Sequence, residues 1–231
     1  LLVSDEAVQP TAAPAALPAG IQEINRSPFE TQYTLPEPVR ALALQARADE
    51  DGVATLFGMV LENTQRNGIL YHVIGVNGVT YYHYNESEYF WEQLPALQPD
   101  LIIVSLGTNE ALAGGFRESA FRASVDRFIE NAQRAAPEAA LLLTTNPDVL
   151  RRKRYENPDN LKVRRVILEA ADSVGAAVWD LHRLMGGEGS VRRWRAHELA
   201  HTDFIHFTKK GYRLQAKLLY RALLNAYHAG N

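Results

Sequence analysis

The chain has 231 residues, of which 46% are hydrophobic and 22% charged, a composition that excludes a disordered chain and is typical of one α/β domain with part of a second. Its formal net charge of −3 gives no general attraction to nucleic acid, so we expect no nucleic-acid partner. No apolar run approaches the roughly 20 residues that span a bilayer, which predicts no transmembrane segment, and without cysteine there is no disulfide framework.

Residues 1–67 predict the C-terminal part of a β-rich module together with a linker. Residues 8–20 are rich in alanine and proline, as linkers are. Two apolar runs, 39–47 and 53–61, flank the turn-forming residues 48–52, and this pattern predicts a pair of hairpin strands. The chain starts without a methionine, so we expect a processed chain or a fragment of a longer polypeptide.

From residue 68 onward, short apolar strands alternate with amphipathic helices. The expected strands are nearly continuous runs of branched residues, as in strands buried on both faces: Ile69–Gly75, Leu101–Leu106, Ala140–Thr145 and Ala176–Leu181. The expected helices are Glu86–Leu97, Phe116–Ala135, Leu161–Val174 and Lys209–Tyr227. This order predicts a second domain, 68–231, in which a parallel sheet lies between two layers of helices and carries its site at the carboxyl edge.

Polar segments follow three of the expected strands. Gly75-Val76-Asn77-Gly78, Gly107-Thr108-Asn109-Glu110 and Thr144-Thr145-Asn146-Pro147-Asp148 should therefore share one edge of the sheet. Gly75 is interpreted as a turn residue. The amide of Asn109 is suited to donate a hydrogen bond to a developing oxyanion, while capping of the following helix is the structural alternative.

A carboxylate and an imidazole, Asp203 and His206, stand three residues apart just before the last helix. In this position Asp203 can hold one ring nitrogen while the other acts as a general base. The same spacing also occurs at helix starts, which is the structural alternative. His197 and His201 lie nearby, but the spacings of these histidines and His206, four and five residues, match no strong zinc pattern, so we expect no metal site.

These segments resemble a known family. Gly78 with Val79-Thr80, the tip Gly107-Thr108-Asn109-Glu110 and the pair Asp203 and His206 are similar to the second, third and fifth blocks of the SGNH, or GDSL-type, hydrolases. The resemblance covers roughly residues 68–228.

A narrower resemblance, carried by Gly75–Gly78, Leu97–Ala111 and Met185–Ser190, is to the branch of bacterial peptidoglycan O-acetylesterases. In that branch a β-sandwich similar to carbohydrate-binding modules is inserted between the first and second blocks. Residues 21–67 would be the final strands of such an insert.

The resemblance implies a flavodoxin-like three-layer α/β/α fold with five parallel strands. His206 would be the general base and Asp203 its orienting partner, while the backbone N–H of Gly78 and the side chain of Asn109 would form two parts of the oxyanion hole. The resemblance also implies no metal or other cofactor, hydrolysis of an acetyl ester on a sugar through an acyl-enzyme, and a periplasmic or extracellular location at the cell envelope.

The first block of the family, a strand that ends in Gly-Asp-Ser, is not present in this chain. Ser4 is the nearest match, but the order is Ser-Asp and the glycine is missing. Ser27, Ser105 and Ser190 adjoin the wrong elements, so structural roles are expected for them. We expect an N-terminal companion segment or chain to carry the nucleophilic serine and to fill the centre of the sheet, where backbone groups would otherwise be unpaired.

The favoured function is a serine esterase that removes O-acetyl groups from a cell-wall polysaccharide, with peptidoglycan as the expected substrate. An O-acetyltransferase with the same site would differ only in the acceptor of the acyl group. A non-catalytic carbohydrate-binding protein is the alternative if no serine joins the site. Two basic runs, Arg151–Arg154 and Arg192–Arg195, are interpreted as solvated faces of helices or loops.

Overall fold

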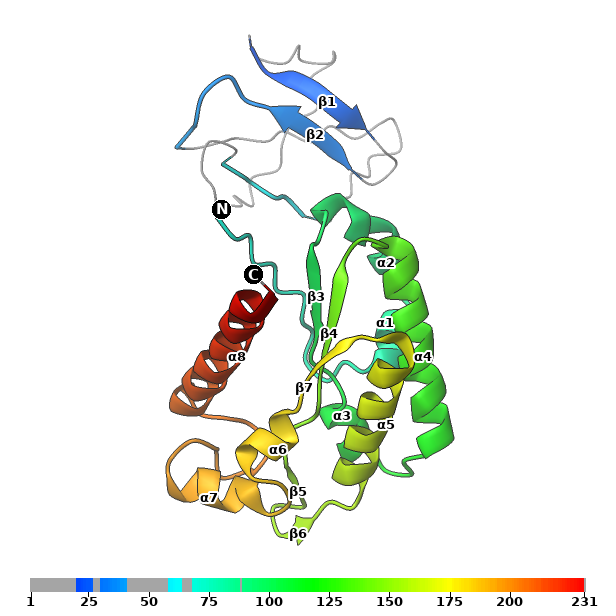
Figure 1. The fold of residues 1–231 in the computed structure, drawn as a ribbon, viewed down its shortest axis with the longest axis vertical. Helices are drawn as coiled ribbons and strands as arrows, with labels where there is room; N and C mark the ends of the chain where they lie inside the picture. Colours follow the sequence, from blue (N-terminus) through cyan, green and yellow to red (C-terminus); the bar gives the residue numbers. More distant parts are fainter. Residues whose placement is uncertain (1–19, 27–29, 41–57, 64–67, 88, 231) are drawn as a thin grey trace, which may run out of the picture. The chain divides into compact units, whose positions relative to one another are not determined.

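The computed structural model describes residues 20–26, 30–40, 58–63, 68–87 and 89–230. The chain divides into two compact units, Leu1–Val73 and Ile74–Asn231 (Figure 1). The residues expected to form the site all belong to the second unit.

In the first unit, β1 (Gln22–Arg26) and β2 (Thr31–Thr34) form an antiparallel pair, and β2 is exposed along its length. The hairpin predicted over 39–61 lies largely outside the described residues, and its described end, 58–61, contains no strand. The β-rich module therefore stays a prediction.

The second unit is built on a parallel sheet of β3 (Leu101–Val104), β4 (Ala140–Thr144) and β7 (Ala177–Trp179), in that order. Within β4, alternate side chains enter different cores: Leu143 faces one layer of helices and Leu142 the other. Three of the four predicted strands are thus confirmed, each shorter than its apolar run.

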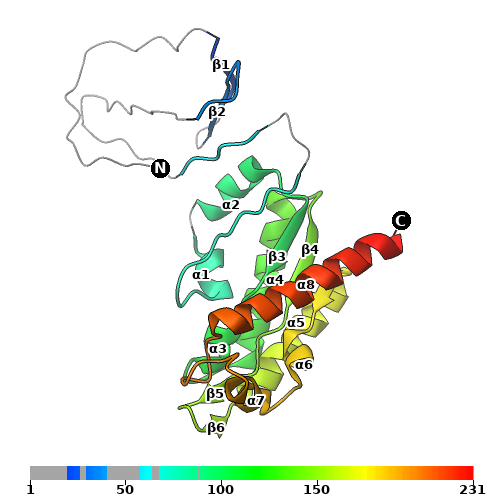
Figure 2. The ribbon, with the colours of Figure 1, turned by 90° about the vertical axis from the view of Figure 1, so that its left-hand side faces the viewer.

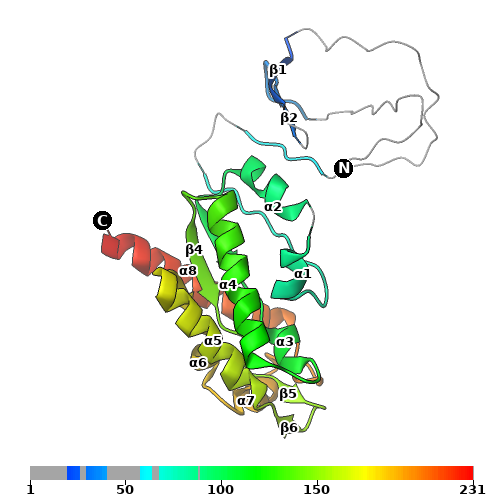
Figure 3. The same ribbon diagram turned by 90° about the vertical axis from the view of Figure 1, so that its right-hand side faces the viewer.

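One face of this sheet is covered by α4 (Glu118–Ala135) and α5 (Asp159–Val174) (Figure 3). Both helices follow the predicted apolar periodicity, because residues three and four apart share a face. The buried stripe of α4 consists of Phe121, Val125, Phe128, Ile129 and Ala132.

The opposite face is covered by α6 (Leu181–Met185), α7 (Ser190–Ala196) and α8 (Lys209–Gly230) (Figure 2). Leu142 and Trp179 contribute the sheet side of this second core. Helices on both faces of a parallel sheet confirm the predicted three-layer α/β/α fold.

A helix predicted over Glu86–Leu97 is replaced by two shorter pieces. α2 (Phe90–Gln93) passes directly into the 3₁₀-helix η1 (Leu94–Leu97), which contains Pro95. Proline lacks an N–H and cannot continue the α-helical hydrogen bonds, so the turn tightens there. Just before it, α1 (Tyr81–Asn85) is a helix that was not predicted.

The strand predicted at Ile69–Gly75 is wrong, since the structure assigns no strand to these residues. Its apolar side chains are exposed, Ile69 at 93% and Tyr71 at 79%. A strand forms only when its backbone finds a partner, and within described residues 74–230 β3 pairs on one edge alone, with β4. The apolar pattern of a buried strand is present without the neighbour that would bury it.

Helix α8 is also incompletely covered. It has 22 residues, yet among them only Gly211 is buried. Its apolar stripe, which includes Leu214, Leu218 and Leu223, is half-buried against the second core. A helix of this length usually hides such a stripe completely.

A short antiparallel hairpin, β5 (Leu150–Arg151) and β6 (Tyr155–Glu156), follows β4 and was not predicted. The N–H of Arg154 donates to the carbonyl of Arg151 (3.2 Å), and φ is positive at both central residues, Arg152 (51°) and Lys153 (61°). These are the features of a type I′ turn, which favours Asn and Gly. Left-handed conformations cost about 1–2 kcal/mol per non-glycine residue.

A substitution at Gly211 tests how closely the backbone of α8 approaches the segment before it. A Cβ on this glycine would lie 2.0 Å from the carbonyl oxygen of Leu199. Helix propensity alone would favour alanine by about 1 kcal/mol, but the backbone approach leaves no room, so Gly211→Ala should instead lower the free energy of unfolding by roughly 1–3 kcal/mol. Urea unfolding measures the change. Gly230→Ala, in the same helix with open space around its Cβ position, is the control and should not destabilise.

Candidate active site

The segment before α8 folds into a tight turn around one carboxylate. Oδ1 of Asp203 accepts hydrogen bonds from the backbone N–H groups of Ile205 (2.9 Å) and His206 (3.0 Å), and Oδ2 lies 2.8 Å from Nδ1 of His206. Phe204, between them, has a positive φ of 59°. The carboxylate therefore fixes both the backbone of the turn and the orientation of the imidazole.

The pKa of Asp203 reflects two opposing effects. Burial raises it, but the hydrogen bond with the His206 ring and the backbone N–H groups of Ile205 and His206 outweigh burial and lower the pKa from 3.8 to about 2. Asp203 is therefore a carboxylate even in mildly acidic solution. A permanently charged partner is what a general-base histidine needs.

The His206 ring is open to solvent, with 67% of its side chain exposed. The turn itself is anchored by its backbone: the N–H of His201 donates to the carbonyl of His206 (2.8 Å), and the N–H of Leu150 donates to that of Phe204 (3.2 Å). With Nδ1 held by Asp203, the second ring nitrogen, Nε2, is the one available to a reactant.

Asn109 belongs to α3 (Thr108–Leu112), the first helix after β3 (Figure 1). Its Nδ2 donates to the carbonyl of Val79 (2.7 Å). The N-cap of α3 is Gly107 and no side chain caps the helix, so the capping alternative for Asn109 is wrong. One amide hydrogen is used by Val79, and the second is left for another acceptor.

Gly78 stands next to this contact, in a turn with φ of 77°. A Cβ at this position would have no heavy atom within 4 Å, so the backbone faces open space. Because Val79 is tied to Asn109, the backbone of Gly78 and the amide of Asn109 are neighbours. Such a pair is suited to binding an anionic oxygen.

Glu110 has a structural role that the sequence analysis did not predict. Its Oε1 accepts the backbone N–H of Tyr81 (2.8 Å), so α3 holds the start of α1 as well as the Gly78 turn. Burial raises the pKa of Glu110, and hydrogen bonds from backbone N–H groups oppose that rise in part. The clue in the sequence was an acid directly after Asn109, in the first turn of a helix.

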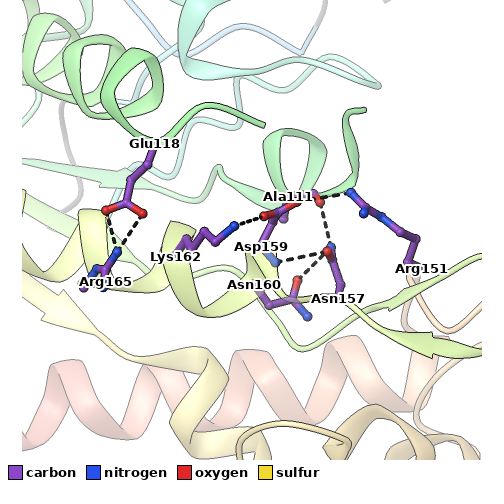
Figure 4. Close-up of polar contacts among 8 residues, drawn as sticks. All are labelled: Ala111, Glu118, Arg151, Asn157, Asp159, Asn160, Lys162 and Arg165. Atoms are coloured by element: carbon purple, nitrogen blue, oxygen red, sulfur yellow. Dashed lines mark hydrogen bonds and ion pairs between the residues drawn. The ribbon is translucent and has the colours of Figure 1, made fainter. Parts of the chain in front are cut away.

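The support of α3 comes from the loop before α5. Nδ2 of Asn157 donates to the carbonyl of Ala111 (2.7 Å), and the carboxylate of Asp159 forms ion pairs with Arg151 (3.2 Å) and Lys162 (2.8 Å) (Figure 4). Buried polar groups that are fully paired fix their neighbours in one arrangement. The Asn109 helix is therefore rigidly placed on the sheet.

The structure joins the expected site residues in two pairs. Asp203 contacts His206, and Asn109 contacts the turn that contains Gly78; no hydrogen bond connects the pairs within the described residues. A pocket of about 720 Å³ is lined by Leu112 from the end of α3 and by Ile205 from the Asp203–His206 turn.

No serine described by the structure reaches the His206 ring. The hydroxyl of Ser105 accepts a hydrogen bond from Thr144 (3.1 Å), and Ser190 is fully buried beside Asp148. Ser4 and Ser27 lie outside the described residues. Among the residues described, no group of three or more potential metal ligands comes together, and none of the helices has the length and apolarity to span a membrane.

The fold is a parallel sheet between two layers of helices. An Asp–His pair and an asparagine amide at the carboxyl edge of this sheet are typical of an α/β protein of the hydrolase class. The model of the GDSL-like lipase/acylhydrolase family matches residues 43–214, and the chain belongs to this family. The predicted SGNH, or GDSL-type, membership is thereby confirmed. No curated protein matches the chain.

Solved structures share the fold at low identity. A peptidoglycan O-acetylesterase is 23% identical with a TM-score of 0.63, over 66% of this chain and 45% of its own. An acetyl xylan esterase is 17% identical with a TM-score of 0.53, over 64% and 78%. A GDSL-like lipase from Bacteroides thetaiotaomicron is 19% identical with a TM-score of 0.51, over 64% and 73%. The matched region is thus less than half the length of the O-acetylesterase.

The Asp203 turn has a testable pH signature. Because the folded pKa is lower than the ordinary value, the carboxylate stabilises the fold above about pH 4, and this stabilisation is lost as pH falls from about 4 to about 2. Asp203→Asn removes it. The difference in unfolding free energy between the wild type and Asp203→Asn should be largest above pH 4 and shrink toward pH 2 in urea titrations. A difference independent of pH would contradict the assigned contacts.

Proposed function

We propose that the protein is a serine esterase that removes O-acetyl groups from a cell-wall polysaccharide. The observation that carries this proposal is the Asp203–His206 pair: a charged carboxylate fixes one nitrogen of an exposed imidazole, in a chain of the GDSL-like lipase/acylhydrolase family. Ester cleavage by a serine needs such a base and an acceptor site for negative charge.

In the proposed mechanism, Nε2 of His206 takes the proton of a serine hydroxyl as its oxygen attacks the acetyl carbon. The negative charge on the carbonyl oxygen is stabilised by the N–H of Gly78, the amide of Asn109 and the serine's own N–H. When the intermediate collapses, His206 returns the proton to the departing sugar oxygen. Water then attacks the acetyl-serine by the same steps and releases acetate.

The serine is proposed to come from a companion segment or chain. Three observations support a missing neighbour: β3 has one unpaired edge within described residues 74–230, the apolar residues of 69–75 are exposed, and the stripe of α8 is half-covered. A further strand beside β3 would pair that edge. Its tip would reach the carboxyl edge where His206 and Asn109 lie.

Peptidoglycan is the proposed substrate, and the cell envelope or its exterior the proposed location. The support is the fold shared with a peptidoglycan O-acetylesterase. A non-catalytic carbohydrate-binding protein is the second candidate, and it is favoured by one observation: no serine described by the structure contacts the His206 ring.

Covalent labelling tests the companion segment. A fluorophosphonate should react with one serine that lies outside residues 1–231, because only a serine deprotonated by His206 is nucleophilic enough. Intact-mass and peptide analysis locate the label, and His206→Ala should abolish it. A folded, unlabelled 25.8 kDa species with no companion peptide would sink the esterase proposal and favour the binding protein.

Removal of the proposed oxyanion donor tests the other half of the site. Asn109→Ala should lower kcat for an aryl acetate by roughly 10²-fold or more, as loss of such a donor does in other acyl-transfer enzymes. KM should change little, because the charge exists only in the transition state. Thermal unfolding is recorded on the same samples. A large loss of stability with unchanged kcat would make Asn109 a structural residue only.

A further inference from the structure

The pocket of about 720 Å³ lies beside the Asp203–His206 turn and has walls from three separate segments. The end of α3, the β5–β6 hairpin and the Asp203–His206 turn contribute Leu112, Arg151, Arg152, Tyr155 and Ile205. Ile205 directly precedes the proposed general base. A group bound in this pocket would therefore belong to the same substrate molecule as the reacting ester.

The hairpin wall of the pocket is basic. Arg151 forms an ion pair with Asp159 (3.2 Å), but in the part of the chain that the structure describes Arg152, Lys153 and Arg154 form none. All three are exposed. A further cation adjoins them, because the guanidinium of Arg192 donates to the carbonyl of Arg154 (2.6 Å).

Glu156 also lines the pocket and is the acid closest to these cations along the hairpin. Its Oε1 lies 3.7 Å from the point where a Cβ would stand on Gly189, at the start of α7. The carboxylate therefore reaches toward α7. Arg151 is paired with Asp159, so Arg152 and Glu156 are the remaining charges of the lining. The excess positive charge lies on the hairpin beside the pocket, where Lys153, Arg154 and Arg192 add three further cations.

The turn of the hairpin is strained at two of these cationic residues. Arg152 and Lys153 both have positive φ, which Asn-Gly would adopt readily. Arginine and lysine at these positions lower the stability of the hairpin, and because both side chains are exposed, packing does not compensate. Strain of this kind is typical of residues kept for binding.

We propose that this pocket binds a carboxylate of the polysaccharide and so selects anionic over neutral acetylated glycans. The inference rests on the proposed esterase function and names its substrate class. Arg152 has a planar guanidinium free for bidentate bonding, and the guanidinium of Arg154 lies over the ring of Tyr155, 5.6 Å from its centroid. Two glycans carry the group: uronic-acid polymers on the sugar itself, and peptidoglycan on its lactyl and peptide substituents.

The test uses O-acetylated polygalacturonate, the same polymer with its carboxylates reduced to alcohols, and O-acetylated peptidoglycan. The protein is used in the form that hydrolyses aryl acetates. The kcat/KM on an anionic polymer should exceed that on the reduced polymer by about 10-fold or more at low salt, as charge-assisted hydrogen bonds allow. The preference should shrink near 1 M salt, where the screening length is about 3 Å. The better anionic substrate identifies the source of the carboxylate.

The double variant R152N/K153G distinguishes an effect of the positive charge on substrate preference from an effect on stability. It gives the turn its favoured residues, so the melting temperature should rise, while the ratio of kcat/KM on anionic to reduced polymer should fall about 10-fold. R213N/K217N, which removes the same charge from exposed positions of α8, is the control and should keep the wild-type ratio. An unchanged ratio in R152N/K153G overturns the inference.

Equilibrium dialysis with deacetylated polygalacturonate and its reduced form keeps the two proposals apart. Binding that needs the carboxylates and is lost in R152N/K153G supports the pocket even if aryl acetate is not hydrolysed, an outcome that overturns the esterase alone. Hydrolysis of aryl acetate with equal binding of both polymers overturns the pocket alone.

Discussion

The buried segment that continues β4 past its last paired residue holds the second unit together. The side chain of Thr145 accepts the N–H of a residue in α6, and the carboxylate of Asp148 accepts the N–H of Val191 (2.9 Å) at the start of α7. Two residues farther on, the N–H of Leu150 donates to the carbonyl of Phe204 in the Asp203–His206 turn. Because these groups are buried, each must be paired, and the pairing leaves one position for the helices and the turn relative to the sheet.

This dependence explains which parts of the fold could be predicted. Strands buried on both faces and long amphipathic helices have a local apolar pattern that predicts them. The strands β3, β4 and β7 and the helices α4, α5 and α8 could therefore be predicted from their own residues. Residues 69–75 carry the same periodicity without forming a strand, because strand formation depends on a neighbour and not on the segment alone. Short elements such as α1 and α3 are set by tertiary contacts and have too few residues for a periodic pattern.

The candidate site likewise has one part that the sequence predicts and one part that it does not. Asp203 and His206 could be paired from their spacing, because three residues is the span of the turn that brings them together. The contact of Glu110 with Tyr81 joins residues 29 positions apart, and no local pattern encodes it. The exposure of Arg152 fits the solvated face that the sequence predicts for its basic run, but its place in a pocket wall and its positive φ are properties of the folded chain.

Within described residues 74–230, one edge of β3 is unpaired, and this edge affects how the protein behaves in solution. Its sequence, Leu101-Ile102-Ile103-Val104, contains no charge, proline or bulge, the devices by which native edge strands discourage association. Such an edge is a template: the first strand that reaches it is held by backbone hydrogen bonds regardless of its origin. If the second unit is produced alone at high concentration, strands from other copies of the unit compete for that position. Aggregation then limits the yield of soluble protein.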